Sequence, residues 1–181
     1  MLTRAQIVAL RVAFVVGGSI VGFVLCESRY RSVETWVSIH VVNLMAGGHH
    51  ASRAGHASIE VVSLHHAAFI AVITPSCSAT ASILAIACLS SLSPRYGLVR
   101  RVLATGIALF TVAAVNVMRI SLSVLVGVHD GVSSLVLFHN WVGGVMTFVY
   151  TLGGYVLLLY ILLPDRPGEP ARAGSELTTA S

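Results

Sequence analysis

Charged residues are scarce in this 181-residue chain: they make up 10% of it, against 56% for hydrophobic residues. A soluble domain carries roughly 25% charged residues, so the composition argues against a water-exposed globular fold. The mean hydropathy of +0.87 points the same way. We therefore expect one all-α integral membrane domain over residues 1–163.

Basic blocks, abundant aromatic residues and closely paired cysteines are also missing. Aromatic residues account for 7% of the chain, and the net charge of +4 comes mostly from arginines near the ends of apolar runs. Membrane topology explains these charges better than a nucleic-acid partner does. The three cysteines, Cys26, Cys77 and Cys88, form no Cys-x-x-Cys pair, which weakens zinc-binding and thioredoxin-like interpretations.

Four apolar runs are each long enough to cross the roughly 30 Å hydrocarbon layer of a bilayer. They cover residues 7–25, 75–92, 102–126 and a last stretch that begins between Val132 and Trp141 and ends at Leu163. The sequence thus predicts about four transmembrane helices, the first of them retained rather than cleaved as a signal peptide. The tail, residues 164–181, is rich in Pro, Gly, Ser and charge, and we expect it to be disordered.

Arginine positions predict the orientation in the membrane, because cytoplasmic loops carry the excess of positive charge. Arg4 and Arg11 flank the start of the first run, and Arg95, Arg100 and Arg101 lie between the second and the third. Placing both clusters inside predicts that both chain ends, including the tail, are cytoplasmic. The insert between the first two runs, residues 27–74, and the short turn at residues 129–131 are then extracytoplasmic.

The insert contains two apolar stretches of different character. In residues 33–45 the apolar positions are close to helical spacing, which predicts a helix along the membrane interface. Residues 47–58 are typical of a loop. Residues 59–73 fit either a strand or a shallow helix, and the sequence does not decide between them.

Arg119 lies inside the third apolar run, where an ionisable side chain costs several kcal/mol unless it has a partner or a watered cavity. Depth along the helices can be counted at 1.5 Å per residue from the inner end of each run. The count places Cys77 roughly 22 Å, Arg119 roughly 25 Å and His139 roughly 36 Å from that end. All three lie near the outer boundary of the hydrocarbon, so we expect them to meet in one layer.

The residues around these three positions suit nucleophilic chemistry. Thr74 can cap the second helix and Pro75 suits its first position, which would place Cys77 in the first turn, where the helix dipole favours an anion. A thiolate is a strong nucleophile. A neighbouring imidazole can take the thiol proton and later deliver it to a leaving amine. A fixed guanidinium can stabilise the thiolate or an oxyanion.

Polar residues also follow a helical period in the third run. Asn116, Arg119 and Ser123 recur at three- and four-residue steps, which predicts a polar stripe that faces the interior of the helix bundle. In the fourth run, His139 and Asn140 stand just before Trp141, a residue type that is common at the membrane interface.

Three motifs at these positions resemble those of the exosortase/archaeosortase family, multi-pass membrane cysteine transpeptidases that process C-terminal sorting signals. The family's Cys-Ser-Gly motif, followed shortly by Ser, corresponds to Cys77-Ser78-Ala79 with Ser82; Asn-x-x-Arg-Ile is complete from Asn116 to Ile120; and Phe-His-x-x-x-Gly runs from Phe138 to Gly143. The resemblance covers roughly residues 59–163. Two features depart from it: Ala79 replaces the usual glycine, and the chain has about four spans where many relatives have more.

The resemblance implies a membrane cysteine endopeptidase or transpeptidase that needs no cofactor or metal. It implies Cys77 as the nucleophile, Arg119 as the electrostatic stabiliser and His139 as the acid/base. The supporting residues would be Asn116, Ser78, Ser82 and Asn140. The implied substrate is a secreted protein whose C-terminal sorting signal has a recognition motif, a transmembrane helix and a basic tail. An acceptor amine or water would resolve the acyl-enzyme.

Other interpretations stay open at this stage. Cys77 could be a packing cysteine, or it could form a disulfide with Cys26. Arg119 could bind helix-end carbonyls or snorkel to the interface. The chain could instead be a thiol–disulfide redox protein, or a non-enzymatic membrane protein that binds haem or a metal. The histidines available for the last role are His49, His50, His56, His65 and His66, whose spacing matches no zinc pattern.

Overall fold

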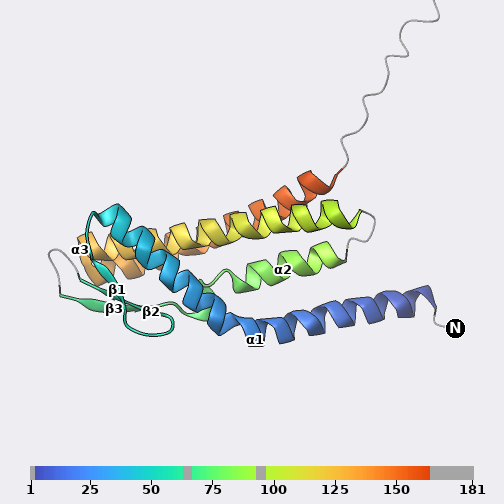
Figure 1. The fold of residues 1–181 in the computed structure, drawn as a ribbon, viewed down its shortest axis with the longest axis horizontal. Coiled ribbons are helices and arrows are strands. Elements are labelled where there is room, and N and C mark those ends of the chain that lie inside the picture. The colour runs from blue at the N-terminus through green and yellow to red at the C-terminus, as the bar shows by residue number, and fades with distance from the viewer. Residues whose placement is uncertain (1–2, 63–66, 93–96, 164–181) are drawn as a thin grey trace, which may run out of the picture.

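The structure is a computed structural model that describes residues 3–62, 67–92 and 97–163 (Figure 1). In chain order the elements are α1 (Arg4–Ala46), β1 (Ala51–Arg53), β2 (Ser58–Val61), β3 (Phe69–Val72), the 3-10 helix η1 (Pro75–Cys77), α2 (Thr80–Ser91) and α3 (Leu98–Leu162). The predicted tail, together with Arg95, His65 and His66, lies outside the described residues.

Helix α1 is one continuous helix of 43 residues, about 65 Å long at 1.5 Å per residue. Thr3 and Gln6 form a capping box at its start, and Gly47 ends it with a left-handed φ of 70°. The first predicted span is the first part of this helix. The predicted interfacial helix at 33–45 is its last part rather than a separate element, because no Gly or Pro between the two stretches interrupts the helix.

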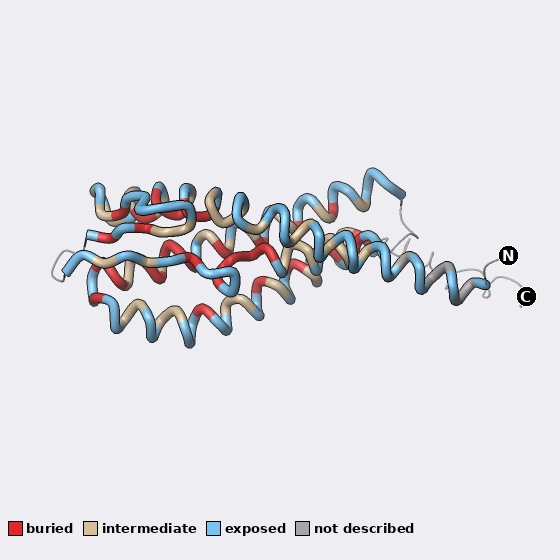
Figure 2. The backbone as a smooth tube through the Cα atoms, turned by 90° about the horizontal axis from the view of Figure 1, so that it is seen from below, coloured by how far each residue is buried: buried red, intermediate tan, exposed pale blue. Residues whose placement is uncertain are grey.

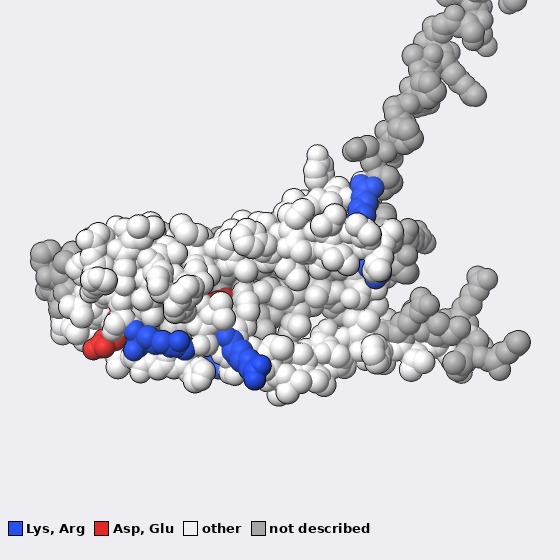
Figure 3. Space-filling view, in the orientation of Figure 1, with Lys and Arg blue, Asp and Glu red and all other residues white. Residues whose placement is uncertain are grey.

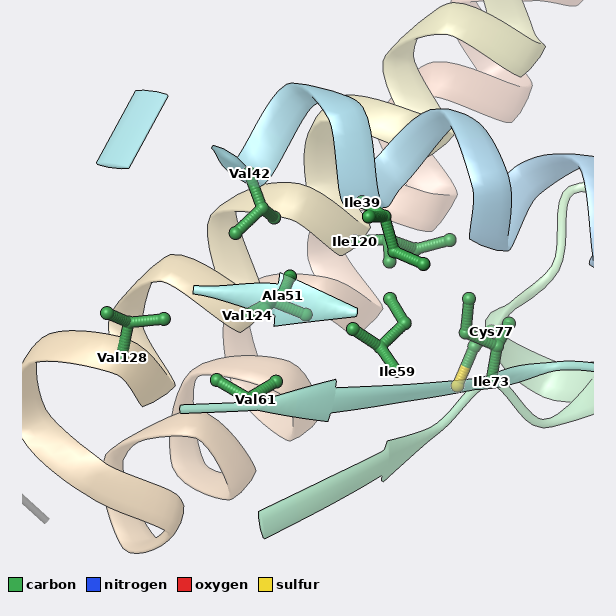
Figure 4. Packing of buried hydrophobic residues seen from close by; sticks show 10 residues of the cluster. All are labelled: Ile39, Val42, Ala51, Ile59, Val61, Ile73, Cys77, Ile120, Val124 and Val128. Atoms are coloured by element: carbon green, nitrogen blue, oxygen red, sulfur yellow. The ribbon is translucent and has the colours of Figure 1, made fainter. Parts of the chain in front are cut away.

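The fold is mostly helical, as predicted, but it is not all-α, because the insert forms a three-stranded antiparallel sheet in the order β1-β2-β3. Strand β2 shows why: Ile59 and Val61 are buried while Glu60 between them is exposed, which is the two-residue alternation of a half-buried strand. Ile59 and Val61 pack in an apolar cluster with Val42 of α1 and Val124 of α3 (Figure 4). Burial against these two helices decides the strand conformation that the short apolar run left open.

The second predicted span is not a single helix. Its first residues form the short turn η1, Ser78 is extended with φ −81° and ψ 145°, and α2 begins only at Thr80. Helix α2 has 12 residues, so its length of about 18 Å is too short to cross a bilayer alone. The extended Ser78 separates the turn that contains Cys77 from α2, the helix that was predicted to include this cysteine.

Helix α3 contains the third and fourth predicted runs. Gly131 interrupts it with φ 82° and ψ 179°, a conformation that favours glycine, and the chain doubles back there into two arms that lie side by side (Figure 1). We call residues 98–130 the first arm and residues 132–162 the second arm. By length and apolar composition, two described helices could cross a membrane, Val12–Ala46 and Leu98–Leu162, where four had been predicted.

Beside its buried apolar clusters, this molecule buries several polar side chains and exposes many large apolar ones. Polar side chains such as Glu34, Thr35 and Asn116 are buried, whereas Phe14 and Leu44 are 81% and 83% exposed. Figure 2 shows that most of the N-terminal part of α1 is exposed. On the face seen in Figure 3, charged side chains gather near the sheet and at the opposite end of the molecule, with an uncharged surface between them. Such a surface suits an apolar surrounding.

Candidate active site

Cys77 occupies the last position of η1 and is buried, with 7% of its surface exposed. Its main-chain N–H donates to Thr74 O at 2.9 Å, which closes the turn. Its sulfur has two side-chain partners: Thr74 Oγ1 at 2.9 Å and His139 Nε2 at 3.1 Å. The hydroxyl of Thr74 therefore faces the thiol and does not cap a helix as predicted.

The bend at Gly131 brings His139 to the thiol. His139 lies about two helical turns into the second arm, which runs back along the first arm and so returns toward Cys77. Gly143 follows one turn later on the same face. A methyl group added at Gly143 would lie 3.2 Å from Arg119 Nη1 and 3.7 Å from His139 Nδ1. The glycine thus leaves room for Arg119 of the first arm to approach the second arm beside His139.

Arg119 is buried at 3% exposure, and its guanidinium binds the main chain of Cys77 rather than the sulfur. Nη2 donates to Cys77 O at 2.5 Å, and Nε donates to Asn116 Oδ1 at 3.1 Å. Nη1 donates to Gly143 O at 3.1 Å and to Thr147 Oγ1 at 3.0 Å. Arg119 therefore binds main-chain carbonyls, which was one of the interpretations left open, and one of these carbonyls belongs to Cys77.

Asn116 extends this network to a carboxylate. Its Nδ2 donates to Cys77 O at 3.1 Å and to Glu34 Oε1 at 2.7 Å, while its Oδ1 accepts from Arg119 and from the Tyr150 hydroxyl. The polar stripe was predicted correctly: Asn116, Arg119 and Ser123 are all buried. Asn116 is the residue that joins the guanidinium to the carboxylate.

Glu34 is the functional candidate that sequence reasoning missed. It is 2% exposed, and its Oε1 also accepts the main-chain N–H of Ala79 at 3.1 Å. Glu34 thus holds the main chain just after the Cys77 turn, and the side-chain amide of Asn116 links its carboxylate to the guanidinium of Arg119. The signal was present in the sequence, since a carboxylate in an apolar helical stretch raises the same question as Arg119 does.

The four predicted supporting residues differ in what they contact. Asn116 joins the network, and Ser78 is bonded to Thr80, accepting its N–H at 3.3 Å at the start of α2. Ser82 bonds Thr151 at 2.7 Å and thereby ties α2 to the second arm. Asn140 is exposed, and no hydrogen bond between described residues joins it to the network of Arg119, Asn116 and Glu34.

Ala79 fits its position without strain. Its φ of −73° and ψ of 0° lie in the right-handed region, which alanine adopts freely. The residue is fully buried, its main-chain N–H donates to Glu34, and its carbonyl accepts the N–H of Ile83 at 2.9 Å. Alanine at this position, where the similar motif has glycine, therefore requires no special backbone conformation.

The structure bears on the disulfide interpretation of Cys77, whereas two of the five candidate metal-binding histidines, His65 and His66, lie outside the described residues. All three cysteines are free: Cys26 is exposed on α1 and Cys88 is half-buried in α2, so no disulfide links Cys26 to Cys77. Across residues 3–62, 67–92 and 97–163, no group of three His, Cys, Asp or Glu side chains is placed to hold a metal ion.

A cavity of about 220 Å³ opens beside the thiol and the imidazole. Its lining is almost entirely apolar and comes from β3 and both arms of α3, with Cys77, His139 and Ser123 as the polar members. In Figure 4, Cys77 lies beside Ile73 at the end of the apolar cluster that leads from the sheet. A ligand in this cavity would reach the sulfur from the side of the sheet.

Comparisons with protein-family models, with curated proteins and with solved structures found no match for this chain. The functional argument therefore depends on the site itself. A buried thiol in hydrogen-bond contact with an imidazole, next to an apolar cavity, is an arrangement that can carry out nucleophilic attack with proton transfer.

Proposed function

We propose that this chain is a membrane cysteine protease or transpeptidase that cleaves the C-terminal sorting signal of a secreted, membrane-anchored protein through a thioacyl-enzyme. The observation that carries the proposal is the 3.1 Å contact between Cys77 Sγ and His139 Nε2. Both side chains line the apolar cavity. The three sequence motifs described above supply the substrate class.

The proposed location is the cytoplasmic membrane, with both chain ends inside and the site on the outer side. Two long apolar helices and an apolar outer surface support an integral membrane protein. The start of α1 and both ends of α3 lie at the end of the molecule opposite the sheet (Figure 1). Arg100 and Arg101 at that end favour the cytoplasmic side, and the sheet and Cys77 are then extracytoplasmic.

The chemistry begins with the transfer of the Cys77 thiol proton to His139 Nε2. The sulfur then attacks the carbonyl carbon of the scissile peptide bond and forms a C–S bond. As the C–N bond breaks, His139 returns the proton to the leaving amine, and a thioester stays on Cys77. An acceptor amine or water attacks this thioester, and the thiol is restored.

The remaining residues act on the position and charge of the nucleophile. The Thr74 hydroxyl can donate a hydrogen bond to the thiolate, because it lies 2.9 Å from the sulfur. Arg119 and Asn116 both bind Cys77 O, so we assign them as positioning residues. The fixed positive charge of Arg119 also favours a negative charge on the adjacent side chain.

The test compares cells that carry the wild-type chain with cells that carry Cys77→Ala. Mass spectrometry of the C-termini of secreted proteins with a C-terminal transmembrane helix and basic tail should show cleaved products only with the wild type. Cys26→Ala and Cys88→Ala are matched controls that remove a thiol away from His139, and both should leave cleavage intact. Normal cleavage with Cys77→Ala would overturn the proposal.

A further inference from the structure

Strand β3 forms one edge of the sheet. It pairs with β2 on one side, and the sheet order places no described strand on the other. The Ile73 N–H donates to Ala57 O at 2.8 Å, in line with the β2–β3 register. Alternate residues of an antiparallel strand bond to the same neighbour. Phe69 and Ala71 therefore bond toward β2, whereas the main-chain groups of Ile70 and Val72 point to the free edge.

The cavity at the active site runs along this free edge. One wall is β3 from Phe69 to Ile73, and the opposite wall is the second arm of α3 at Val132, Leu135 and Val136. Cys77 and His139 line the same cavity. Among the residues that the structure describes, no Asp, Glu, Lys or Arg side chain lines it, so this lining suits an uncharged occupant.

Both lips of the cavity are apolar and exposed. Ile70 and Val72 are 62% and 61% exposed on the strand side, and Val132 and Val136 are 47% and 48% exposed on the helix side. Strand β3 carries none of the charges or prolines that usually protect a sheet edge. An open edge of this kind is a template for a further strand, because another main chain supplies the C=O acceptors and N–H donors that its N–H and C=O groups need.

We propose that β3 binds an extended, uncharged segment of the substrate as a fourth strand. The segment pairs with the main chain of Ile70 and Val72, and its side chains enter the cavity between β3 and the second arm. This pairing guides the scissile carbonyl to Cys77, which follows β3 closely in the chain. The inference rests on the proposed function and adds to it that recognition at this edge is by main-chain hydrogen bonds.

A lipid acyl chain would fill the same apolar cavity without main-chain hydrogen bonds, so the test must separate the two occupants. The probe is acetyl-Val-Val-Val chloromethyl ketone, which alkylates a thiol with loss of chloride. Two further probes carry an N-methyl group on either the first or the second valine. Because a strand presents alternate N–H groups to the same neighbour, only one of the two isomers should lose a bond to β3.

The measurement is the rate of Cys77 alkylation in the purified full-length chain, with iodoacetamide as the reference reagent. We expect one N-methyl isomer to label about tenfold more slowly than the parent probe and the other to match the parent. Ile70→Pro removes the outward N–H while keeping the ladder to β2, and it should slow the parent probe by a similar factor. Ile70→Ala removes the same side chain but retains that N–H, so the difference in labelling rate between the two variants measures the main-chain bond. Iodoacetamide labelling should be the same in both variants.

The outcomes separate the two proposals. Strand addition is supported if one N-methyl isomer alkylates Cys77 more slowly than the parent probe and if the parent probe alkylates Ile70→Pro more slowly than Ile70→Ala. Equal rates for all three probes would overturn it and leave the thiol chemistry of the proposed function in place. A Cys77 that reacts with neither the probes nor iodoacetamide in the folded chain would overturn both proposals.

Discussion

An arginine joins the two arms of α3 at each of two levels, and the two arginines differ in their surroundings. We call the level near the sheet the sheet end and the level near Leu98 and Leu162 the far end. At the far end, Arg100 is exposed and donates to Ile161 O at 2.8 Å and to Leu163 O at 2.9 Å. At the sheet end, Arg119 is buried and donates to Gly143 O and Cys77 O. An exposed charge is solvated, whereas a buried one needs a complete set of partners. Arg119 has such partners in Asn116 and in the Cys77 and Gly143 carbonyls, and Asn116 continues this network to Glu34.

The apolar packing also differs between the two ends, in the size and shape of the side chains. The cluster near the sheet consists mainly of branched residues from helices and strands, including Val42, Ile59 and Val124. The far cluster depends on small residues of the first arm, Ala104 and Ala108, which let α2 and the second arm approach closely. One end therefore positions polar groups, and the other holds the helices together.

Removal of the Cys77 thiol, at the sheet end, should have the largest effect on the cleavage rate. We expect Cys77→Ala to lower cleavage at least about 10³-fold, because no other group can form the acyl intermediate. His139→Ala should lower it about 10²–10⁴-fold through loss of the acid/base. Initial rates on a processed substrate measure both, with Cys88→Ala as the control. Comparable losses in Cys88→Ala would mean that the decrease comes from the fold and not from the site.

Glu34→Ala should destabilise the sheet end by about 3–5 kcal/mol. The substitution leaves the Ala79 N–H and Asn116 Nδ2 short of an acceptor and removes the charge that balances Arg119. Thermal unfolding in detergent measures the change. Glu60→Ala, which removes an exposed carboxylate from β2, is the control and should stay within about 0.5 kcal/mol. Equal effects of the two would show that the buried network contributes little to stability.

Adjacent glycines test the packing at the far end. A methyl group at Gly154 would clash with Val112 and lie 3.1 Å from Ile86, whereas one at Gly153 meets nothing within 4 Å. We expect Gly154→Ala to destabilise the protein by about 1–3 kcal/mol. Gly153→Ala should be neutral or stabilising by up to about 1 kcal/mol, because alanine is the better helix former. If both variants unfold at the same temperature, close packing at Gly154 is not required.

The corresponding pair at the site should show the smallest effect. Gly143→Ala would place a methyl group 3.2 Å from Arg119 Nη1, which its hydrogen bonds hold in place, while Gly144→Ala points into open space. We expect Gly143→Ala to lower the cleavage rate about tenfold through displacement of Arg119 or His139. Gly144→Ala should cleave at the wild-type rate. A reversed order would contradict the contact between Gly143 and these two side chains.

Much of the candidate site could be predicted from the sequence because helical geometry is regular. The depth count at 1.5 Å per residue anticipated that Cys77, Arg119 and His139 meet, and the spacing of Asn116 and Ser123 anticipated the buried stripe. The roles of these residues stay predictions. Glu34 could not be assigned in the same way, because its burial depends on how the last part of α1 packs against the Cys77 turn.

The sequence by itself determined the apolar character of the chain, the turn at Gly131 and the three polar groups that share one layer, because composition, glycine conformation and helical rise are local properties. Only the tertiary structure decided that the insert is a sheet with an open edge, that α2 begins after Cys77 and that Arg119 binds the Cys77 carbonyl. These features depend on contacts between segments far apart in the chain. No local pattern records which strand finds a partner or which carbonyl faces a guanidinium.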